Sequence, residues 1–161
     1  MNTFFSIILS NFTLVTLVLA VIFSLIPRYG QSFGETLTRS MLLLPIGLVG
    51  VWAFYYHAFH PEMAAHMIGW QTSPFQFEVA VANLGMGLAG IIGYWRSKDW
   101  AIAVAVVNSC FSLGAAYGHI HQMIEVGNYS PGNAGTILYT DIAIPILLWI
   151  GILLWKKDSA E

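Results

Sequence analysis

Histidine and carboxylate residues gather near two connections between the hydrophobic segments of this chain. All five histidines lie there, namely His57, His60, His66, His119 and His121. Four acidic residues lie beside the same connections, namely Glu62, Glu78, Glu125 and Asp141. Imidazole and carboxylate groups together bind transition metals, and as a pair they can also act as acid and base. The distribution therefore predicts one polar site at one end of the molecule.

Helical spacing decides which histidines can face a common site. His57 and His60 are three residues apart, so a helix places them on adjacent turns of one face. His119 and His121 are two apart and point about 200° away from each other. His119 continues a stripe of small and polar residues that comprises Asn108, Ser112, Ala115 and Gln122. We expect His119 to face the bundle, and His121 to face lipid headgroups or water.

A metal centre is the chemistry that these residue types favour. The predicted ligands are His57, His60, Glu78, His119 and Asp141. Zinc or iron suits this set. Copper is a weaker candidate, because the neighbouring methionines Met63, Met67 and Met123 also serve as ordinary packing residues. Two further interpretations stay open: a hydrogen-bonded polar cluster without metal, and a haem held by His57 and His119.

The composition identifies the kind of protein that holds this site. Hydrophobic residues make up 57% of the 161 residues and charged residues only 9%. Soluble domains have about 25% charged residues. The sequence therefore predicts an integral membrane protein with a single domain, residues 1–161. No basic patch offers a nucleic-acid surface, and the single cysteine, Cys110, excludes an intramolecular disulfide.

Five apolar segments approach the roughly 20 residues that a membrane-spanning helix needs. They cover about 4–26, 40–60, 75–95, 100–124 and 136–155. Each should be helical, because hydrocarbon leaves no water to satisfy an exposed backbone. The predicted fold is an all-α integral membrane protein with five transmembrane helices.

The positions of the basic residues predict the orientation of this bundle. The six Lys and Arg residues fall in the first and third connections and the C-terminal tail, as Arg28, Arg39, Arg96, Lys98, Lys156 and Lys157. Cytoplasmic connections carry such an excess. We therefore expect the N-terminus outside, the C-terminus in the cytoplasm, and the site on the periplasmic or extracellular side of the plasma (inner) membrane.

Helical rise places four of the predicted ligands at a similar depth. His57, Glu78, His119 and Asp141 come out roughly 21–28 Å above the cytoplasmic ends of their helices, at about 1.5 Å per residue. Glu78 and Asp141 also lie in first turns, where the helix dipole alone favours a carboxylate. These four side chains come from four helices and lie at a similar depth, which nevertheless predicts a common site.

Glycines and prolines predict how the helices pack. Gly85, Ala89 and Gly93 form a ridge of small residues that suits close helix contact. Gly85-x-Gly87-x-x-Gly90 also matches a dinucleotide fingerprint, which we reject because that motif follows a strand. Pro145 frees the carbonyl of Asp141 from its helical hydrogen bond, whereas Pro45 has no polar neighbour.

Three stretches carry a resemblance to a known family. They are FEVAVANLGMG (residues 77–87), GHIHQM (118–123) and PGNAG (131–135). These resemble an uncharacterised family of small prokaryotic integral membrane proteins, a domain of unknown function. The resemblance implies a bacterial or archaeal membrane protein, and it implies no reaction.

The predicted function is that of a metal-dependent membrane enzyme acting on a lipophilic substrate that enters from the bilayer. Glu78 and His119 are the predicted catalytic residues, with Glu78 the general base where it does not bind the metal. An acid–base isomerase would use the same residue types without a metal. A metal-ion or proton transport protein and a non-catalytic subunit of a membrane complex are also compatible with the sequence. Association into a homo-oligomer and the roles of His66 and His121 stay open.

Overall fold

The computed structural model of the protein describes residues 11–156, and this part of the chain is all-helical without a strand. The α-helices, in chain order, are α2 (Phe12–Ser24), α3 (Phe33–Met41), α4 (Val49–Phe59), α5 (Pro61–Ile68), α6 (Phe75–Gly93), α7 (Lys98–Val126), α8 (Pro131–Ala134) and α9 (Thr136–Leu154). A π-helical segment, η1 (Leu42–Leu48), joins α3 to α4 without a break.

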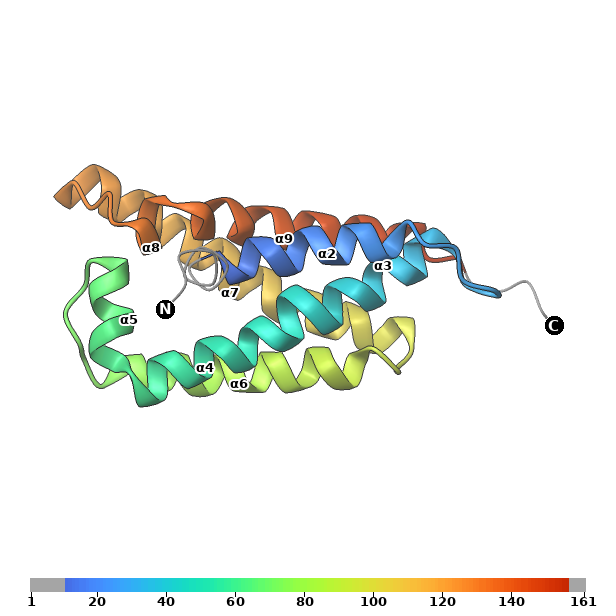
Figure 1. The fold of residues 1–161 in the computed structure, drawn as a ribbon, viewed down its shortest axis with the longest axis horizontal. Coiled ribbons are helices and arrows are strands. Elements are labelled where there is room, and N and C mark those ends of the chain that lie inside the picture. The colour runs from blue at the N-terminus through green and yellow to red at the C-terminus, as the bar shows by residue number, and fades with distance from the viewer. Residues whose placement is uncertain (1–10, 157–161) are drawn as a thin grey trace, which may run out of the picture.

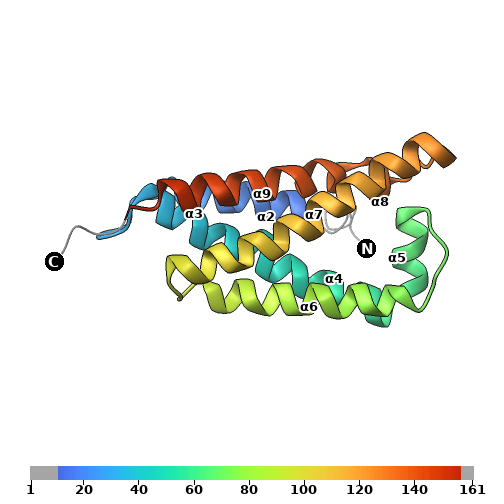
Figure 2. The same cartoon turned by 180° about the vertical axis from the view of Figure 1, so that it is seen from behind.

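The long helices, together with the continuous α3–η1–α4 segment, run side by side along one axis (Figure 1). The view from behind shows the same arrangement for α2, α6, α7, α9 and the continuous α3–η1–α4 segment (Figure 2). Helices α5 and α8 both lie at one end of the bundle, which we call the α5–α8 end. The α2–α3 connection, the α6–α7 turn and the end of α9 lie at the other, which we call the arginine end.

Four helices of the described chain are long and apolar enough to cross a membrane. They are Phe33–Phe59, Phe75–Gly93, Lys98–Val126 and Pro131–Leu154. Many large apolar side chains on them face outward, which suits contact with lipid. The architecture is that of a multi-pass, all-α membrane protein.

The helix boundaries agree with the sequence prediction for three of the five segments. Residues 4–10 of the first predicted segment lie outside the described part, and the remainder contains a shorter apolar helix, Phe12–Ser24. The prediction that the second segment begins near residue 40 is wrong, because α3 begins at Phe33. Ser32 caps it, its Oγ accepting a hydrogen bond from the backbone N–H of Glu35. The spacing Ser32-x-x-Glu35 is a helix-start signal that the hydropathy pattern concealed.

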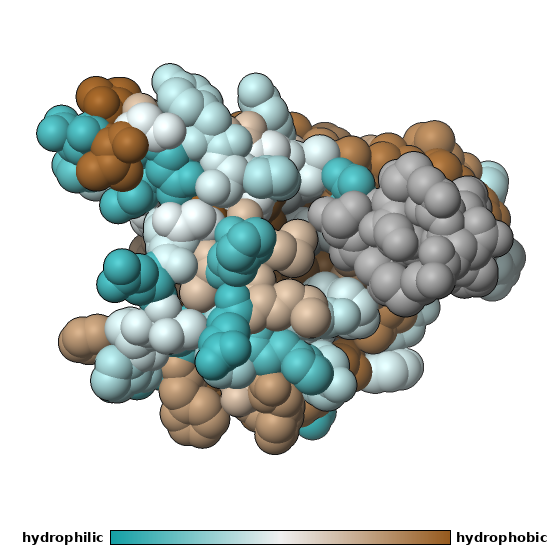
Figure 3. Space-filling view, turned by 60° about the vertical axis from the view of Figure 1, so that its left-hand side comes forward, coloured by the Kyte–Doolittle hydropathy of each residue, from teal (hydrophilic) through white to brown (hydrophobic). Residues whose placement is uncertain are grey.

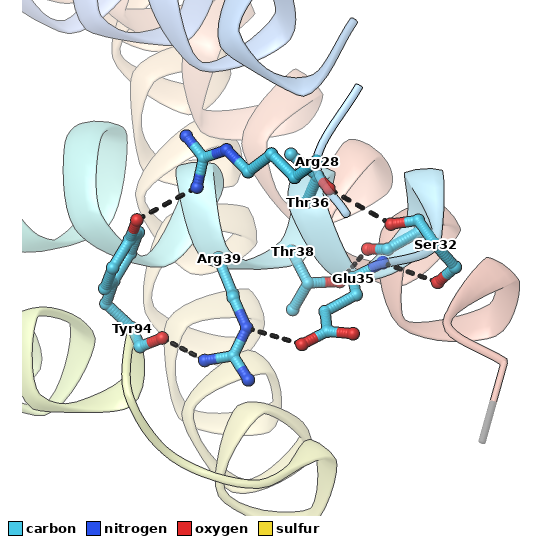
Figure 4. A network of polar contacts seen from close by, with 8 residues as sticks. Arg28, Ser32, Glu35, Thr36, Thr38, Arg39 and Tyr94 are labelled. Carbon is cyan, nitrogen blue, oxygen red and sulfur yellow. Dashed lines mark hydrogen bonds and ion pairs between the residues drawn. The ribbon is translucent and has the colours of Figure 1, made fainter. Parts of the chain in front are cut away.

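The arginine end is tied together by two guanidinium groups (Figure 4). Arg39 donates to the carboxylate of Glu35 at 2.8 Å and to the backbone carbonyl of Tyr94. Arg28 donates to the hydroxyl of Tyr94 at 3.0 Å, which links the α2–α3 connection to the end of α6. Arg39 also lies over the Trp155 ring, 5.1 Å from its centroid. These contacts join three helix ends with groups that favour a membrane interface.

The apolar core fills the half of the bundle nearest the arginine end. It is built from side chains of α2, α3, η1, the start of α7 and the end of α9, namely Leu17, Ala20, Leu37, Met41, Leu42, Ile46, Ala101, Val104, Ala105, Ile144, Leu148 and Ile152. Among residues 11–156, no charged side chain belongs to this core. The α5–α8 end is thereby left to the polar residues.

Helices α4 and α6 approach each other through glycines. A Cβ on Gly50 would lie 2.7 Å from the Cα of Gly87, and a Cβ on Gly87 would lie 2.8 Å from the backbone nitrogen of Val51. The predicted ridge is therefore wrong for Gly85, which has nothing within 4 Å of a built Cβ in the described structure. Pro45 lies inside the π-helical turn, where its missing N–H interrupts the α-helical hydrogen bonds.

Candidate functional site

Hydrophilic side chains gather over the α5–α8 end. Figure 3 looks obliquely onto this end, where hydrophilic residues cover much of the surface and apolar residues lie at its margins. Of the five histidines, all of which the structure describes, His119 alone is buried, with 7% of its surface exposed. The candidate site is therefore built outward from His119.

Three elements hold the imidazole of His119, which lies on α7. Its Nδ1 is 2.8 Å from the side-chain oxygen of Asn133 on α8. Its Nε2 is 3.6 Å from Oδ2 of Asp141 on α9. The ring of Trp70, from the α5–α6 connection, stacks on it with 6.3 Å between centroids and 27° between planes. Residues remote in the sequence thus enclose one imidazole.

The hydrogen bonds of Asn133 determine which nitrogen of His119 carries the proton. The amide nitrogen of Asn133 donates to the carbonyls of His119 at 3.1 Å and Asn128 at 2.8 Å. The amide oxygen of Asn133 therefore faces Nδ1, and an oxygen of this kind only accepts hydrogen bonds. Nδ1 must carry the hydrogen, so a neutral His119 presents its unprotonated Nε2 to Asp141.

Asp141 and His119 are close enough to form an ion pair but too far apart to form a hydrogen bond. A separation of 3.6 Å exceeds hydrogen-bond length but lies within ion-pair range once the imidazole is protonated. The Asp141 side chain is 14% exposed and that of His119 is 8% exposed. Two largely buried side chains in this arrangement can take up a proton from a bound molecule and return it.

The connection between α7 and α8 has a sequence that shapes the pocket for His119. Gly127 ends α7 with a left-handed φ of 65°, which glycine adopts without strain. The side-chain oxygen of Asn128 accepts from the backbone N–H of Ser130 at 3.1 Å, a turn typical of asparagine. Pro131 then opens α8 and brings Asn133 under the imidazole.

The α7–α8 connection is hydrogen-bonded to the end of α5, which precedes the connection that carries Trp70. The amide nitrogen of Asn128 donates to the carbonyl of Ile68 at 2.9 Å. A Cβ on Gly132 would lie 2.8 Å from the carbonyl oxygen of Met67, so α8 touches the end of α5 directly. Helix α5 begins at Pro61, and Glu62 and His66 on it are exposed.

The structure brings together only part of the predicted metal site. His119 and Asp141 meet, as described. His60 is exposed and contacts the Tyr55 hydroxyl at 3.0 Å. Glu78 is exposed on the first turn of α6. His57 lines a separate pocket. Within residues 11–156, no group of three or more His, Cys, Asp or Glu side chains could hold a metal ion. The predicted metal centre therefore stays a prediction, of which the described structure brings only His119 and Asp141 together.

A comparison with family models assigns the chain. A model described as a family of unknown function, DUF6790, matches residues 10–161. The chain belongs to DUF6790. Comparisons with curated proteins and with solved structures found no match. The DUF6790 match covers His119, Asn133 and Asp141 together, and the family description names no activity.

Sequence reasoning on this DUF6790 protein places His119 correctly and misses two of its partners. The stripe on α7 predicts that His119 is buried and His121 exposed, and both predictions are confirmed. Asn133 and Trp70 are absent from the predicted site, because neither has a helical spacing to His119. The available signals were the turn residues of PGNAG, which predict a tight connection, and the position of Trp70 beside Gly69.

Proposed function

We propose that this protein is a membrane-embedded acid–base enzyme in which His119 and Asp141 move a proton on a lipophilic substrate. The observation that supports it is the orientation of His119: Asn133 holds Nδ1 while Nε2 faces Asp141 at 3.6 Å. Histidine is the side chain that acts most often as a general acid or base, and a third group commonly orients it. The reaction needs no metal, and the described residues offer no group of three ligands for one.

The proposed reaction needs only the residues of the site. Nε2 of His119 accepts a proton from the substrate, and the imidazolium that forms is stabilised by the Asp141 carboxylate. Return of the same proton to another atom of the substrate completes an isomerisation, with no co-reactant. Trp70, which is 48% exposed, covers the imidazole and must move aside to admit the substrate.

The proposed topology places this site at the outer leaflet of the plasma membrane. All five described Lys and Arg residues lie at the arginine end. Arg28 and Arg39 bind Tyr94, and Lys98 donates to the carbonyl of Trp155 at 2.8 Å, next to Lys156 in the sequence. Arg96 lies over the Trp100 ring. The positive-inside bias puts this end in the cytoplasm. We propose five spans in all, the first of which includes Phe12–Ser24, with the N-terminus outside.

A reporter fused after Glu161 tests this topology. We expect alkaline phosphatase at this position to be inactive and green fluorescent protein to be fluorescent, because the C-terminus is cytoplasmic. A fusion in the α7–α8 connection after Tyr129 should give the opposite pattern. An active phosphatase after Glu161 would contradict both the orientation and the outer position of the site.

Deuterium exchange tests the proposed chemistry without knowledge of the substrate. The purified protein, reconstituted with a total lipid extract in D2O, should place deuterium in, or isomerise, a lipophilic species detected by mass spectrometry. His119→Gln should lower this rate by about 10²- to 10⁴-fold, the usual contribution of a general acid–base group. His121→Gln is the matched control, because His121 is exposed on the same helix turn. Equal exchange in wild type and His119→Gln would refute the proposal.

A proton relay is the second candidate function, favoured by two buried polar residues on α7. Asn108 and Ser112 lie on the same helix face as His119, and they are 8% and 6% exposed. The Asn108 side-chain oxygen has no hydrogen-bond partner within the described structure. Proton uptake by liposomes that depends on Asn108, with no change in any lipid, would favour this candidate.

A further inference from the structure

A second pocket lies at the α5–α8 end, away from His119. It is an open pocket of about 350 Å³ where the end of α4, the start of α5 and the start of α6 meet. Its lining includes His57, Thr72, Ser73, Gln76 and Phe77, which are distinct from the residues around His119. Small-molecule sites commonly occupy about 300–1,000 Å³. The pocket is therefore large enough for the head of an organic molecule.

His57, which lines this pocket, has an unmet hydrogen bond. Its Nδ1 is buried and has no hydrogen-bond partner in the described part of the chain. Buried polar atoms are nearly always paired, and an exception in a pocket wall points to a missing partner. We propose that this pocket binds the hydroxyl head of a neutral, long-chain alcohol-type lipid, and that the His57 imidazole turns to present Nδ1 as its hydrogen-bond partner.

The remaining polar groups of the pocket favour a neutral, hydroxyl-bearing head. Thr72 and Ser73 contribute hydroxyls, which both donate and accept. The Gln76 amide nitrogen is already committed to the carbonyl of Pro61 at 2.7 Å, so its oxygen remains as an acceptor. Among the described residues, the lining has no Lys, Arg, Asp or Glu. An anionic head would lack a cation here, and an ammonium head would lack a carboxylate.

The apolar surroundings favour a long-chain tail on the same ligand. Phe77 lines the pocket and is 59% exposed, and Phe75, two residues earlier on α6, is 71% exposed. These rings belong to a helix that is apolar enough to cross a membrane. An alkyl chain leaving the pocket can lie along them, toward lipid, while its hydroxyl stays beside His57. This placement does not depend on the reaction proposed for His119.

Photolabelling of the full chain in nanodiscs tests this site. The probe is a long-chain alkanol that carries a diazirine near its hydroxyl. Probes with a carboxylate, an ammonium group or no head group, on the same chain, serve as comparisons. We expect the alkanol to label the peptides that contain residues 57–61 and 72–77 more strongly than the other three probes. His57→Phe, which keeps a ring but no nitrogen, should reduce this labelling by about fivefold, as expected for one lost hydrogen bond.

Matched variants make the outcome decisive. His66→Phe removes an exposed histidine on α5 that does not line the pocket, and it should label as the wild type does. The double variant Thr72→Val, Ser73→Ala removes two exposed hydroxyls and should also lower labelling, so the test survives if His57→Phe does not fold. Unchanged labelling in both pocket variants, or equal labelling by the headless or charged probes, overturns the proposal.

Discussion

Replacing Asn133 by leucine is expected to lower the free energy of unfolding by about 2–4 kcal/mol. Asn133 is fully buried, and its amide makes three hydrogen bonds, to Nδ1 and the carbonyl of His119 and to the carbonyl of Asn128. Leucine has a similar size but would leave Nδ1 of His119 and the carbonyl of Asn128 unpaired, at about 1–3 kcal/mol for each buried group, whereas the carbonyl of His119 lies inside α7. Some of this cost is recovered in a membrane, because partners also exist in the unfolded state.

The same substitution should release the imidazole of His119. In the wild type, nitrogen NMR of ¹⁵N-histidine-labelled protein should show the His119 ring as a single Nδ1–H form, because Asn133 accepts from that nitrogen. In Asn133→Leu the two tautomers should mix. Asn133→Asp keeps an oxygen for Nδ1 but loses the donor to both carbonyls, so it should retain the tautomer and lose stability.

Asn83→Leu is the control for this pair of measurements. The amide nitrogen of Asn83 donates to the carbonyl of Val79 within its own helix, at 2.9 Å. Its loss should change the free energy of unfolding by less than about 1 kcal/mol. If Asn133→Leu were as mild as Asn83→Leu, or left the His119 spectrum unchanged, then Asn133 would not be the residue that orients the site.

Replacing Gly87 by alanine should lower the free energy of unfolding by about 1–3 kcal/mol, the usual cost of overpacking. The added methyl group would lie 2.8 Å from the backbone nitrogen of Val51 and 3.0 Å from the carbonyl carbon of Gly50. Both atoms belong to the backbone of α4, so no side chain can rotate away. Helices α4 and α6 would have to separate along much of their length.

Gly85→Ala separates packing from helix propensity. Both positions lie in the middle of α6, and alanine favours a helix over glycine by about 1 kcal/mol at each. Gly85 has open space around it in the described structure, so its substitution should be neutral or stabilising. Denaturation by SDS in bicelles, followed by circular dichroism, measures both variants. Equal effects at the two positions would contradict the close approach of α4 and α6.

The sequence predicted the helices well wherever hydropathy alone defines them. Segments 75–95, 100–124 and 136–155 match α6, α7 and α9 to within a few residues, because a membrane-spanning helix must satisfy its backbone internally over a fixed length. The early start of α3 was missed for a related reason. Residues 33–39 are largely polar, and their helix depends on the Ser32 cap and the contacts of Arg39, which hydropathy does not measure.

Helix contacts were less predictable, because a glycine-rich helix offers several faces of small residues. Gly85, Ala89 and Gly93 follow the spacing expected of a contact ridge, and Gly87 and Gly90 give a neighbouring face of α6 the same character. The choice between the two faces depends on the partner helix. Gly50 of α4 has no side chain, so the backbone of Gly87 can pack directly against it. The two glycines face each other only after the two helices have packed together.

The amino-acid pattern alone was enough to specify an apolar helical bundle with its histidines at one end and its arginines at the other. Hydropathy and helical period are local properties, and they also placed His119 on the buried face of α7. Which polar residues meet was settled by the packing of the helices. His119 joins Asn133, Asp141 and Trp70, while His57 lines a separate pocket. The reason is that the orientation of a helix about its own axis is set by packing against its neighbours, and similar depth along that axis does not bring side chains together.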